Sequence, residues 1–372
     1  MKITSVETVG VEVNHRGNWL FVRVHTDEGL VGLGEASHSG DDGLLAAAIR
    51  HRLGPQLAGQ DASRVAALSQ RLPPGSAGPL LRTAASALEQ ALWDLNGQAL
   101  GVPIHRFWGG PVRQRIRLYA NINRATNNRR PEGFAANARA AAAEGFHGVK
   151  LAPFDDVQLR ELDQPETWRT IELGLERVRA VRETVGPDVL VLVDCHSRLT
   201  PALAARVVRE LESVGLFWLE DPVPHDELDG LAEVRAGAET MIASGERYQS
   251  SAEFREMIVQ RAADVLMPDI KHVGGYAELH RVSALAEPWH VLIAPHNPSG
   301  PVAAAASVQA CASLANFLIL EYAWGEVPYR ASLVDPPERI EDGFLTVPDR
   351  PGLGLSLNDE AIAEHAFDPL AD

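Results

Sequence analysis

The chain has 372 residues, of which 45% are hydrophobic and 23% charged, values typical of a folded globular protein rather than a disordered one. It carries 34 basic and 50 acidic residues, a formal charge of −16, which argues against nucleic acid as a partner. With two cysteines and no apolar run near the roughly 18 residues of a membrane span, we expect a cytoplasmic protein with no disulfide framework and no membrane contact.

The N-terminal part changes character once. Residues 1–36 alternate β-branched and polar residues around a DEG turn, which is typical of an antiparallel meander. Residues 41–108 are rich in alanine and leucine at helical spacing, and a long helical segment there ends at Gly101, two residues before Pro103. Strands followed by helices predict an α+β domain over residues 1–114.

Residues 115–327 repeat one unit, an apolar strand followed by a polar junction and an amphipathic helix. The strand-like runs are RIRLYANI, GVKLA, VLVLVD, LFWLE, TMIASGE, VLMPDI, HVLIAPH and FLILEYA. Eight strands alternating with helices, some of them apolar on both faces, predict the α/β fold class and a (β/α)8 barrel of the TIM type. Residues 328–372 are dense in proline and glycine, and we expect them to return over the surface toward the first domain.

Polar residues end six of these strands at nearly equal spacing. They are Asp194, Glu220, Glu246, Asp269, His296 and Glu321, separated by 26, 26, 23, 27 and 25 residues, each about one βα unit. In such a barrel the carboxyl ends of the strands meet at one rim, where the active site lies. Any one of these residues alone would more readily be a solvated strand end or a helix cap. Six in phase predict a shared site.

Three of the acids, Asp194, Glu220 and Glu246, would face one another with no base between them. Their mutual repulsion predicts a bound cation. Oxygen ligands from three strands suit a hard octahedral ion, so we expect Mg²⁺, with Mn²⁺ able to substitute.

Neighbouring residues add positive charge and proton-transfer groups to this rim. Side chains alternate along a strand, so His196 is expected on the same side as Asp194. Lys150, which ends the second strand, would supply the local positive charge that an acidic protein needs for an anionic substrate, or would be a structural ion-pair partner. Asp269 and His296 end adjacent strands, and a carboxylate beside an imidazole raises its basicity, which predicts His296 as a general base.

Several motifs together resemble the mandelate racemase subgroup of the enolase superfamily over nearly the whole chain. They are GEA at 34–36, SALEQALWDLNGQALGVP, VKLA, VDCH, WLEDP, SGER, MPDIKHVGG, APHNPSGP and LEY. The resemblance implies an N-terminal α+β capping domain over the barrel, Mg²⁺ on the third, fourth and fifth strands, and removal of a proton next to a substrate carboxylate. It also implies that the C-terminal segment completes the capping domain.

The resemblance implies a role for each rim residue. The acids at 194, 220 and 246 would be the metal ligands, Asp269 and His296 the base dyad, and Glu321 the acid that hydrogen-bonds the substrate carboxylate. The second strand departs from the racemases, which have two lysines separated by one residue. In this chain the first of the two positions is Lys150 and the second is Ala152. The base for the opposite face of the substrate is missing, which argues against racemisation.

His196 moves the expectation toward dehydration, since acid-sugar dehydratases of this subgroup, galactonate dehydratase among them, include members with histidine at this position. In this hypothesis His296 removes the α-proton, Lys150 and Mg²⁺ hold the enediolate, and His196 assists loss of the β-hydroxyl, giving a 2-keto-3-deoxy acid. A cycloisomerase or epimerase acting on a sugar acid or lactone is the alternative. A catalytically silent scaffold or binding protein is a third interpretation.

Loops of the first domain near residues 15–19 and 37–42 are expected to cover the mouth and to select the substrate. The candidate substrate contacts are Arg16, Trp19, Asn121, Asn123, Arg247 and Tyr248, and each could equally be an ordinary loop residue. The expected partner is a small carboxylate. Barrels with this resemblance commonly associate through the capping domain, so we also expect a homo-oligomer.

Overall fold

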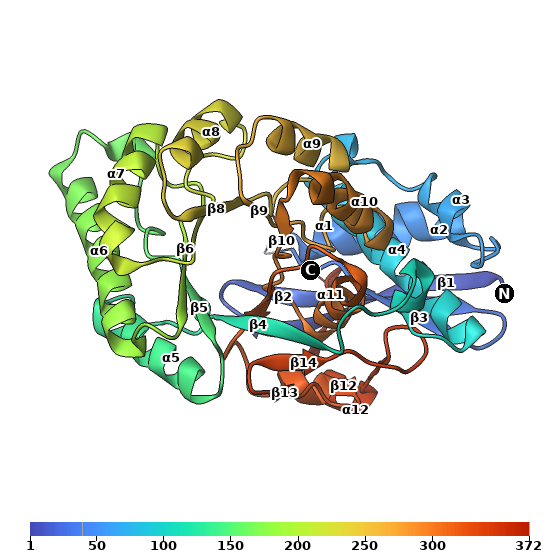
Figure 1. The fold of residues 1–372 in the computed structure, drawn as a ribbon. Coiled ribbons are helices and arrows are strands. Elements are labelled where there is room, and N and C mark those ends of the chain that lie inside the picture. Colours follow the sequence, from blue (N-terminus) through green and yellow to red (C-terminus); the bar gives the residue numbers. More distant parts are fainter. Residues whose placement is uncertain (39, 372) are drawn as a thin grey trace.

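A computed structural model describes residues 1–38 and 40–371 of the chain. It has a barrel, at the left of Figure 1, and a capping domain built around the N-terminus, at the right. Ser39, in the predicted cover loop 37–42, and Asp372, the last residue, lie outside the described residues. None of the described helices is both long and apolar enough to cross a membrane.

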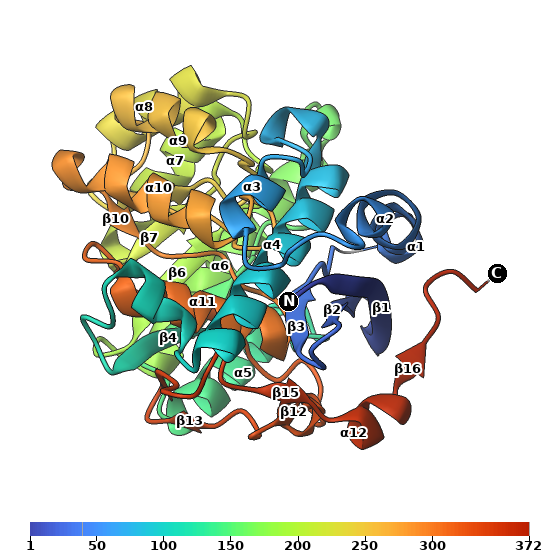
Figure 2. The same cartoon turned by 90° about the vertical axis from the view of Figure 1, so that its right-hand side faces the viewer.

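The capping domain begins with the predicted meander. Its sheet has the order β16-β1-β2-β3, with β1 (Ile3–Asn14), β2 (Gly17–Thr26), β3 (Val31–Glu35) and β16 (Ala366–Phe367) all antiparallel. Figure 2 shows β16, in red, beside β1, in dark blue. The C-terminal segment therefore completes the capping domain, as expected.

Helices follow the meander. They are α1 (Asp42–Ala47), a π-helical turn (Ala48–Leu53), α2 (Gly54–Leu57), α3 (Val65–Ser69) and α4 (Pro79–Leu100). The longest of these helices is α4. Gly101 is its C-cap residue and has a left-handed conformation, with a φ of 68°. Strand β3 packs so closely on α4 that a Cβ added to Gly34 would lie 2.0 Å from the carbonyl oxygen of Ala87. This contact explains why glycine precedes Glu35.

Eight parallel strands form the barrel, which confirms the predicted fold class. They are β4 (Arg115–Asn121), β5 (Gly148–Leu151), β6 (Leu190–Asp194), β7 (Trp218–Glu220), β8 (Met241–Ser244), β9 (Val265–Leu266), β10 (Leu292–Ile293) and β11 (Leu320–Ala323). They pair in sequence order from β4 to β10, and β11 pairs with β4. A single bridge between Ile293 and Phe317 closes the circle. Buried side chains, among them Tyr119 and Trp218 in edge-to-face contact, fill the interior.

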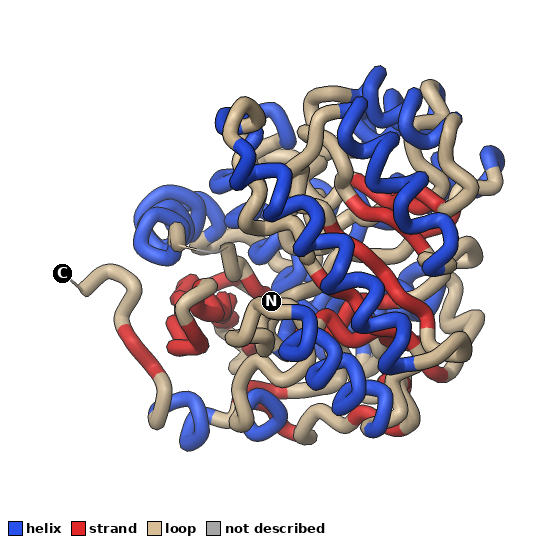
Figure 3. The backbone as a smooth tube through the Cα atoms, turned by 90° about the vertical axis from the view of Figure 1, so that its left-hand side faces the viewer, coloured by secondary structure: helices blue, strands red, loops and turns tan. Residues whose placement is uncertain are grey.

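An α-helix follows each of the first seven strands. They are α5 (Pro131–Ala143), α6 (Pro165–Val185), α7 (Pro201–Leu211), α8 (Leu228–Ala236), α9 (Ser251–Val259), α10 (Tyr276–Ala286) and α11 (Pro301–Ser313). Figure 3 shows helices covering the outside of the strands.

The last repeat differs, because β11 leads to a 3-10 helix (Arg330–Leu333) rather than to an eighth outer α-helix. The chain continues through β12 (Val334–Asp335), β13 (Ile340–Glu341), β14 (Phe344–Thr346), β15 (Ser356–Leu357) and α12 (Asp359–Ala363). Strand β14 pairs antiparallel with the first part of β4. The C-terminal segment therefore occupies the side of the barrel that an eighth helix would cover.

Two buried carboxylates of the capping domain cap barrel helices. Glu35 accepts hydrogen bonds from the backbone N–H groups of Gly300 (2.7 Å) and Ala303 (2.8 Å) at the start of α11. Glu89 accepts from Tyr276 (2.8 Å) and Ala277 (3.1 Å) at the start of α10. Each acid satisfies helix-terminal donors that have no partner within the helix. Burial raises the pKa of both carboxyl groups, that of Glu89 to about 7, while the hydrogen bonds from the helix N–H groups oppose this rise. These hydrogen bonds thus attach the capping domain to the barrel where the loops after β9 and β10 lead into α10 and α11.

Replacing Glu35 by alanine leaves the buried N–H groups at the start of α11 without acceptors. We expect the free energy of unfolding, measured by urea denaturation, to fall by about 2 kcal/mol. The matched control is Glu132→Ala, which removes an exposed acid from the first turn of α5. This change should cost only about 0.5 kcal/mol. Equal losses in the two variants would contradict the capping role of Glu35.

Candidate active site

The three predicted metal ligands converge at the carboxyl end of the barrel strands. Asp194 and Glu220 are register partners at the ends of β6 and β7, and Glu246 lies just beyond β8. One carboxylate oxygen from each lies within 4.8 Å of those from the other two. The regular spacing in the sequence therefore corresponds to a real cluster.

Lys150 contacts two of these three acids and also Glu321. Its Nζ lies 2.8 Å from Glu220 Oε1, 2.8 Å from Glu321 Oε1 and 3.6 Å from Asp194 Oδ2. Burial alone would lower the pKa of Lys150, but the carboxylates of Glu220 and Glu321 raise it well above its usual value. Lys150 is therefore a buried ion-pair partner of these carboxylates, which is one of the two roles expected from the sequence.

One ammonium does not balance all of the acids. Burial and repulsion from Asp194 raise the pKa of Glu220 well above its usual value, despite the attraction of Lys150. Glu246 Oε2 is buried and lies 3.1 Å from His296 Nε2, without a well-aligned hydrogen bond. A group of three carboxylates that has too little positive charge to balance it, and that keeps one oxygen free, fits the ligand preferences of a hard divalent cation.

His196 is held between two carboxylates. Its Nδ1 lies 2.5 Å from Asp155 Oδ1 and its Nε2 lies 3.0 Å from Asp194 Oδ2. Burial opposes its protonation, but Asp194 and Asp155 together raise the pKa of His196 well above its usual value. The structure thus places an imidazole, held by two carboxylates, beside the metal-ligand cluster.

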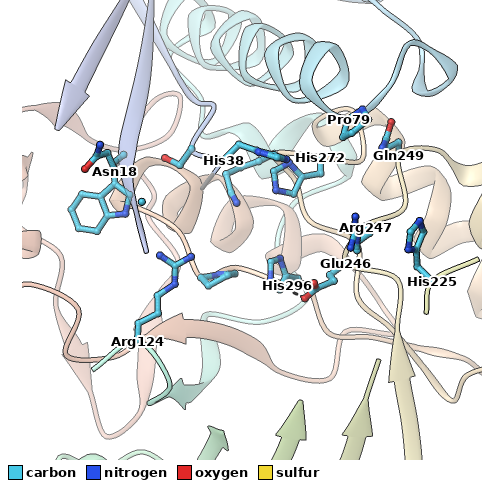
Figure 4. Close-up of a pocket in the computed structure, with 15 residues that line it drawn as sticks. Asn18, His38, Pro79, Arg124, His225, Glu246, Arg247, Gln249, His272 and His296 are labelled. Atoms are coloured by element: carbon cyan, nitrogen blue, oxygen red, sulfur yellow. Dashed lines mark ion pairs between the residues drawn. The ribbon is translucent and has the colours of Figure 1, made fainter. Parts of the chain in front are cut away.

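The predicted dyad is formed on the other side of the cluster. His296 Nδ1 lies 2.8 Å from Asp269 Oδ2, so its Nε2 points toward Glu246 and the mouth (Figure 4). Lys271 also contacts Asp269, with its Nζ 2.9 Å from Oδ2. Burial would raise the pKa of Asp269, but Lys271 and the neighbouring histidines lower it, so that Asp269 is a carboxylate. An ionised Asp269 holds the proton of His296 on Nδ1 and leaves Nε2 as the basic atom.

Glu321 is buried behind the cluster. Its Oε1 accepts a hydrogen bond from Asn121 Nδ2 (2.7 Å) and contacts Lys150, and its Oε2 accepts from the backbone N–H of Asn297 (2.9 Å). Burial opposes ionisation, yet Lys150 and His296 hold the pKa of Glu321 below its usual range. In this arrangement Glu321 only accepts hydrogen bonds. To hydrogen-bond a substrate carboxylate, it would have to carry a proton and donate it.

Two cavities adjoin the cluster, and both are lined by Glu246 and Arg247. The first, of about 420 Å³, lies between the barrel mouth and the capping domain and is drawn in Figure 4. Arg124 points into it from the side of β4, and His38 and His272 line its upper wall in the figure. The second cavity, of about 450 Å³, lies on the His196 side.

Five of the six predicted substrate contacts lie at the mouth or just below it. Trp19 and Arg247 line the first cavity, with the indole Nε1 of Trp19 buried and without a hydrogen-bond partner, and Arg16 and Arg247 line the second. Asn121 and Asn123 are buried below the mouth, where they bond Glu321 and Asp155.

Tyr248 is placed differently from the prediction. Its ring packs edge-on against Phe254 in the barrel core, and its hydroxyl donates to the backbone carbonyl of His225 (3.3 Å). Residues 245–248 form a turn, closed by a hydrogen bond from the backbone N–H of Tyr248 to the carbonyl of Gly245 (3.1 Å), and this turn directs Arg247 to the mouth and Tyr248 into the core.

Two residues of the site were not predicted from the sequence. Asp155 contacts His196, Arg129 (3.0 Å) and Arg16 (3.4 Å), and it lies in a loop after β5. Lys271 lies two residues after Asp269, on the same side. The available signal was the set of charged residues within the VKLAPFDD and MPDIKHVGG motifs.

Comparison with known proteins agrees with this architecture. Residues 4–109 match the mandelate racemase/muconate lactonizing enzyme N-terminal domain, and residues 133–361 match the domain described as enolase C-terminal domain-like. The chain is 33% identical to a D-galactonate dehydratase family member of Streptomyces bingchenggensis, over 99% of this chain and 95% of that protein. It is also 33% identical to the D-xylonate dehydratase of Haloferax volcanii, over 98% of this chain and 89% of the relative.

Solved structures give the same result. A mandelate racemase/muconate lactonizing enzyme-like protein from Rubrobacter xylanophilus superposes with a TM-score of 0.88 at 35% identity, covering 99% of this chain and 98% of that one. A mandelate racemase/muconate lactonizing enzyme from Jannaschia sp. superposes with a TM-score of 0.89 at 32% identity, covering 99% and 98%. The chain belongs to the mandelate racemase/muconate lactonizing enzyme family of the enolase superfamily.

Proposed function

We propose that the protein is a Mg²⁺-dependent dehydratase that converts a sugar acid to a 2-keto-3-deoxy acid. The observation that carries the proposal is the placement of two imidazoles, His296 and His196, on two sides of one carboxylate cluster. A dehydration needs one group to remove the α-proton and another to protonate the departing hydroxyl. The names of the dehydratase relatives support the same reaction class.

The site residues divide the work. Lys150 attracts the substrate carboxylate, and His296 Nε2 removes the proton from the adjacent carbon. Mg²⁺, held by the acids at 194, 220 and 246, would supply the positive charge that stabilises the enediolate oxygens. His196 then donates a proton to the β-hydroxyl, which leaves as water as the C2–C3 double bond forms. The resulting enol tautomerises to the 2-keto acid.

Ala152 supports dehydration over racemisation. It is buried, two residues after Lys150, where the racemases of the family resemblance carry a second lysine. A methyl group can neither take up nor deliver a proton. The proposed base, His296, can therefore remove the α-proton from one face of the substrate, with no second lysine to return a proton to the other face. Elimination needs only the first of these steps, whereas two-base racemisation needs both.

The direct test is incubation with Mg²⁺ and a panel of aldonic and aldaric acids, followed by product mass. We expect at least one acid to lose one water and to form a 2-keto acid. His296→Asn should lower kcat for that acid by about 10²- to 10⁴-fold, because it removes the base. Products isomeric with the substrate would favour a cycloisomerase or epimerase instead.

The matched control is His290→Asn. His290 is exposed and has a φ of 58°, a conformation that asparagine adopts readily, so this variant should keep wild-type turnover. Full activity in both variants would contradict the role of His296 as the base, whereas no product from any acid with the wild-type protein would favour a scaffold. Unchanged circular dichroism and melting temperature exclude unfolding as the cause of a loss.

The role of His196 can be separated from that of His296 by changing the leaving group. His196→Asn should lower kcat for a 3-hydroxy acid by about 10²-fold or more, because the hydroxyl then departs without a proton donor. With the corresponding 3-fluoro acid the loss should be much smaller, since fluoride needs no proton to leave. An equal loss with both substrates would show that His196 is not the acid.

A further inference from the structure

The second cavity at the mouth is lined by three arginines from three different segments. Arg16 comes from the turn between β1 and β2 of the capping domain, Arg198 from the loop after β6, and Arg247 from the loop after β8. We call these three residues the arginine subsite. Glu246 and His196 also line the cavity, so the arginine subsite adjoins the candidate active site directly.

The three arginines of the subsite outnumber the two acids that line the same cavity, Asp155 and Glu246. Asp155, the other acid that lines the cavity, already contacts Arg129 at 3.0 Å and His196 at 2.5 Å, and reaches Arg16 only at 3.4 Å. Arg198 has a buried Nε without a hydrogen-bond partner. Neither Arg198 nor Arg247 forms an ion pair with any residue in the described part of the chain.

This concentration of cations is unusual for a protein of net charge −16. Three like charges that share one cavity repel one another, and a bound anion relieves that repulsion. The planar guanidinium group also matches the geometry of carboxylate and phosphate groups, to which it can donate two parallel hydrogen bonds. The cavity therefore has the chemistry of an anion site.

The direction of the substrate chain leads into this cavity. In the proposed dehydration the first carbon lies at Lys150, the second at His296, and the hydroxyl on the third at His196. Because His196 also lines the arginine cavity, the carbons beyond the third continue toward Arg198 and Arg247.

We propose that the arginine subsite binds a second anionic group at the far end of the substrate, so that the preferred substrate is a dianionic acid sugar. The proposal rests on the proposed dehydration. The terminal group is a carboxylate, as in an aldaric acid, or a phosphate, as in an aldonic acid phosphorylated at its last carbon. Both offer the oxygens that the arginines recognise.

The test compares acids that share the configuration of every carbinol carbon. Each aldonic acid is assayed beside the matching aldaric acid and the matching terminal phosphate ester, and kcat/KM is measured for all three. We expect one of the two dianions to exceed the aldonic acid by at least about tenfold, as one charge-assisted contact would give. Whichever dianion is preferred identifies the terminal group.

Variants then assign the preference to the arginines. Arg198→Gln and Arg247→Gln should each lower the dianion-to-monoanion ratio of kcat/KM by about tenfold. Arg255→Gln, on the exposed face of α9, is the matched control and should leave the ratio unchanged. Binding of the same acids, measured by titration calorimetry in the His296→Asn background with Mg²⁺, should show the same ratios without turnover.

Three results would overturn the inference. If the aldonic acid is turned over as well as both dianions, the inference fails and the dehydratase function stands. If the arginine variants lower kcat/KM for monoanion and dianion equally, the arginines only attract anions in general, and the inference again fails alone. If no acid is bound or dehydrated, both the function and the inference are wrong.

Discussion

The positive charge of Lys150 allows several carboxylates to meet inside the barrel mouth. At an effective dielectric constant of about 20, its two contacts of 2.8 Å with Glu220 and Glu321 amount to about 12 kcal/mol of gross Coulomb attraction. Desolvation of each buried ion offsets several kcal/mol of this. The remaining repulsion is visible in Glu220, whose pKa burial and Asp194 raise in spite of Lys150. The cluster is thus one positive charge or more short of balance, the condition under which a divalent cation would bind.

The capping domain contributes to the site through its attachment as much as through its loops. Glu35 and Glu89 cap α11 and α10, the helices that follow the strands carrying His296 and Asp269. A Cβ on Gly275 would lie 2.0 Å from Glu89 Oε2, so the second glycine of MPDIKHVGG serves this contact between domains. Arg16, in the β1–β2 turn of the same domain, lines the second cavity. The buried hydrogen bonds of Glu35 and Glu89 therefore fix the capping domain against the two helices that follow His296 and Asp269.

Most of the fold and the rim of the site could be predicted because both follow from periodicity. A spacing of one βα unit places Asp194 and Glu220 in register whatever the loops do. His196 does lie beside Asp194, but it does so from a turn just beyond β6, where its φ of 45° departs from strand geometry. Loop residues have no such rule. The reach of Asp155 to His196 depends on the path of the chain after β5, and the positions of Arg247 and Tyr248 depend on which of two neighbours turns inward. The missing eighth outer helix likewise depends on how the C-terminal segment packs against β4.

The central claim is that Asp194, Glu220 and Glu246 form a binding site for a divalent cation. Anomalous diffraction from crystals grown with Mn²⁺ tests it most directly, because it locates the ion without reference to any substrate. We predict one strong anomalous peak among these three carboxylates, and its loss in Glu220→Gln crystals. A structure with millimolar Mn²⁺ and no peak there, or with the ion bound only elsewhere, would contradict the account.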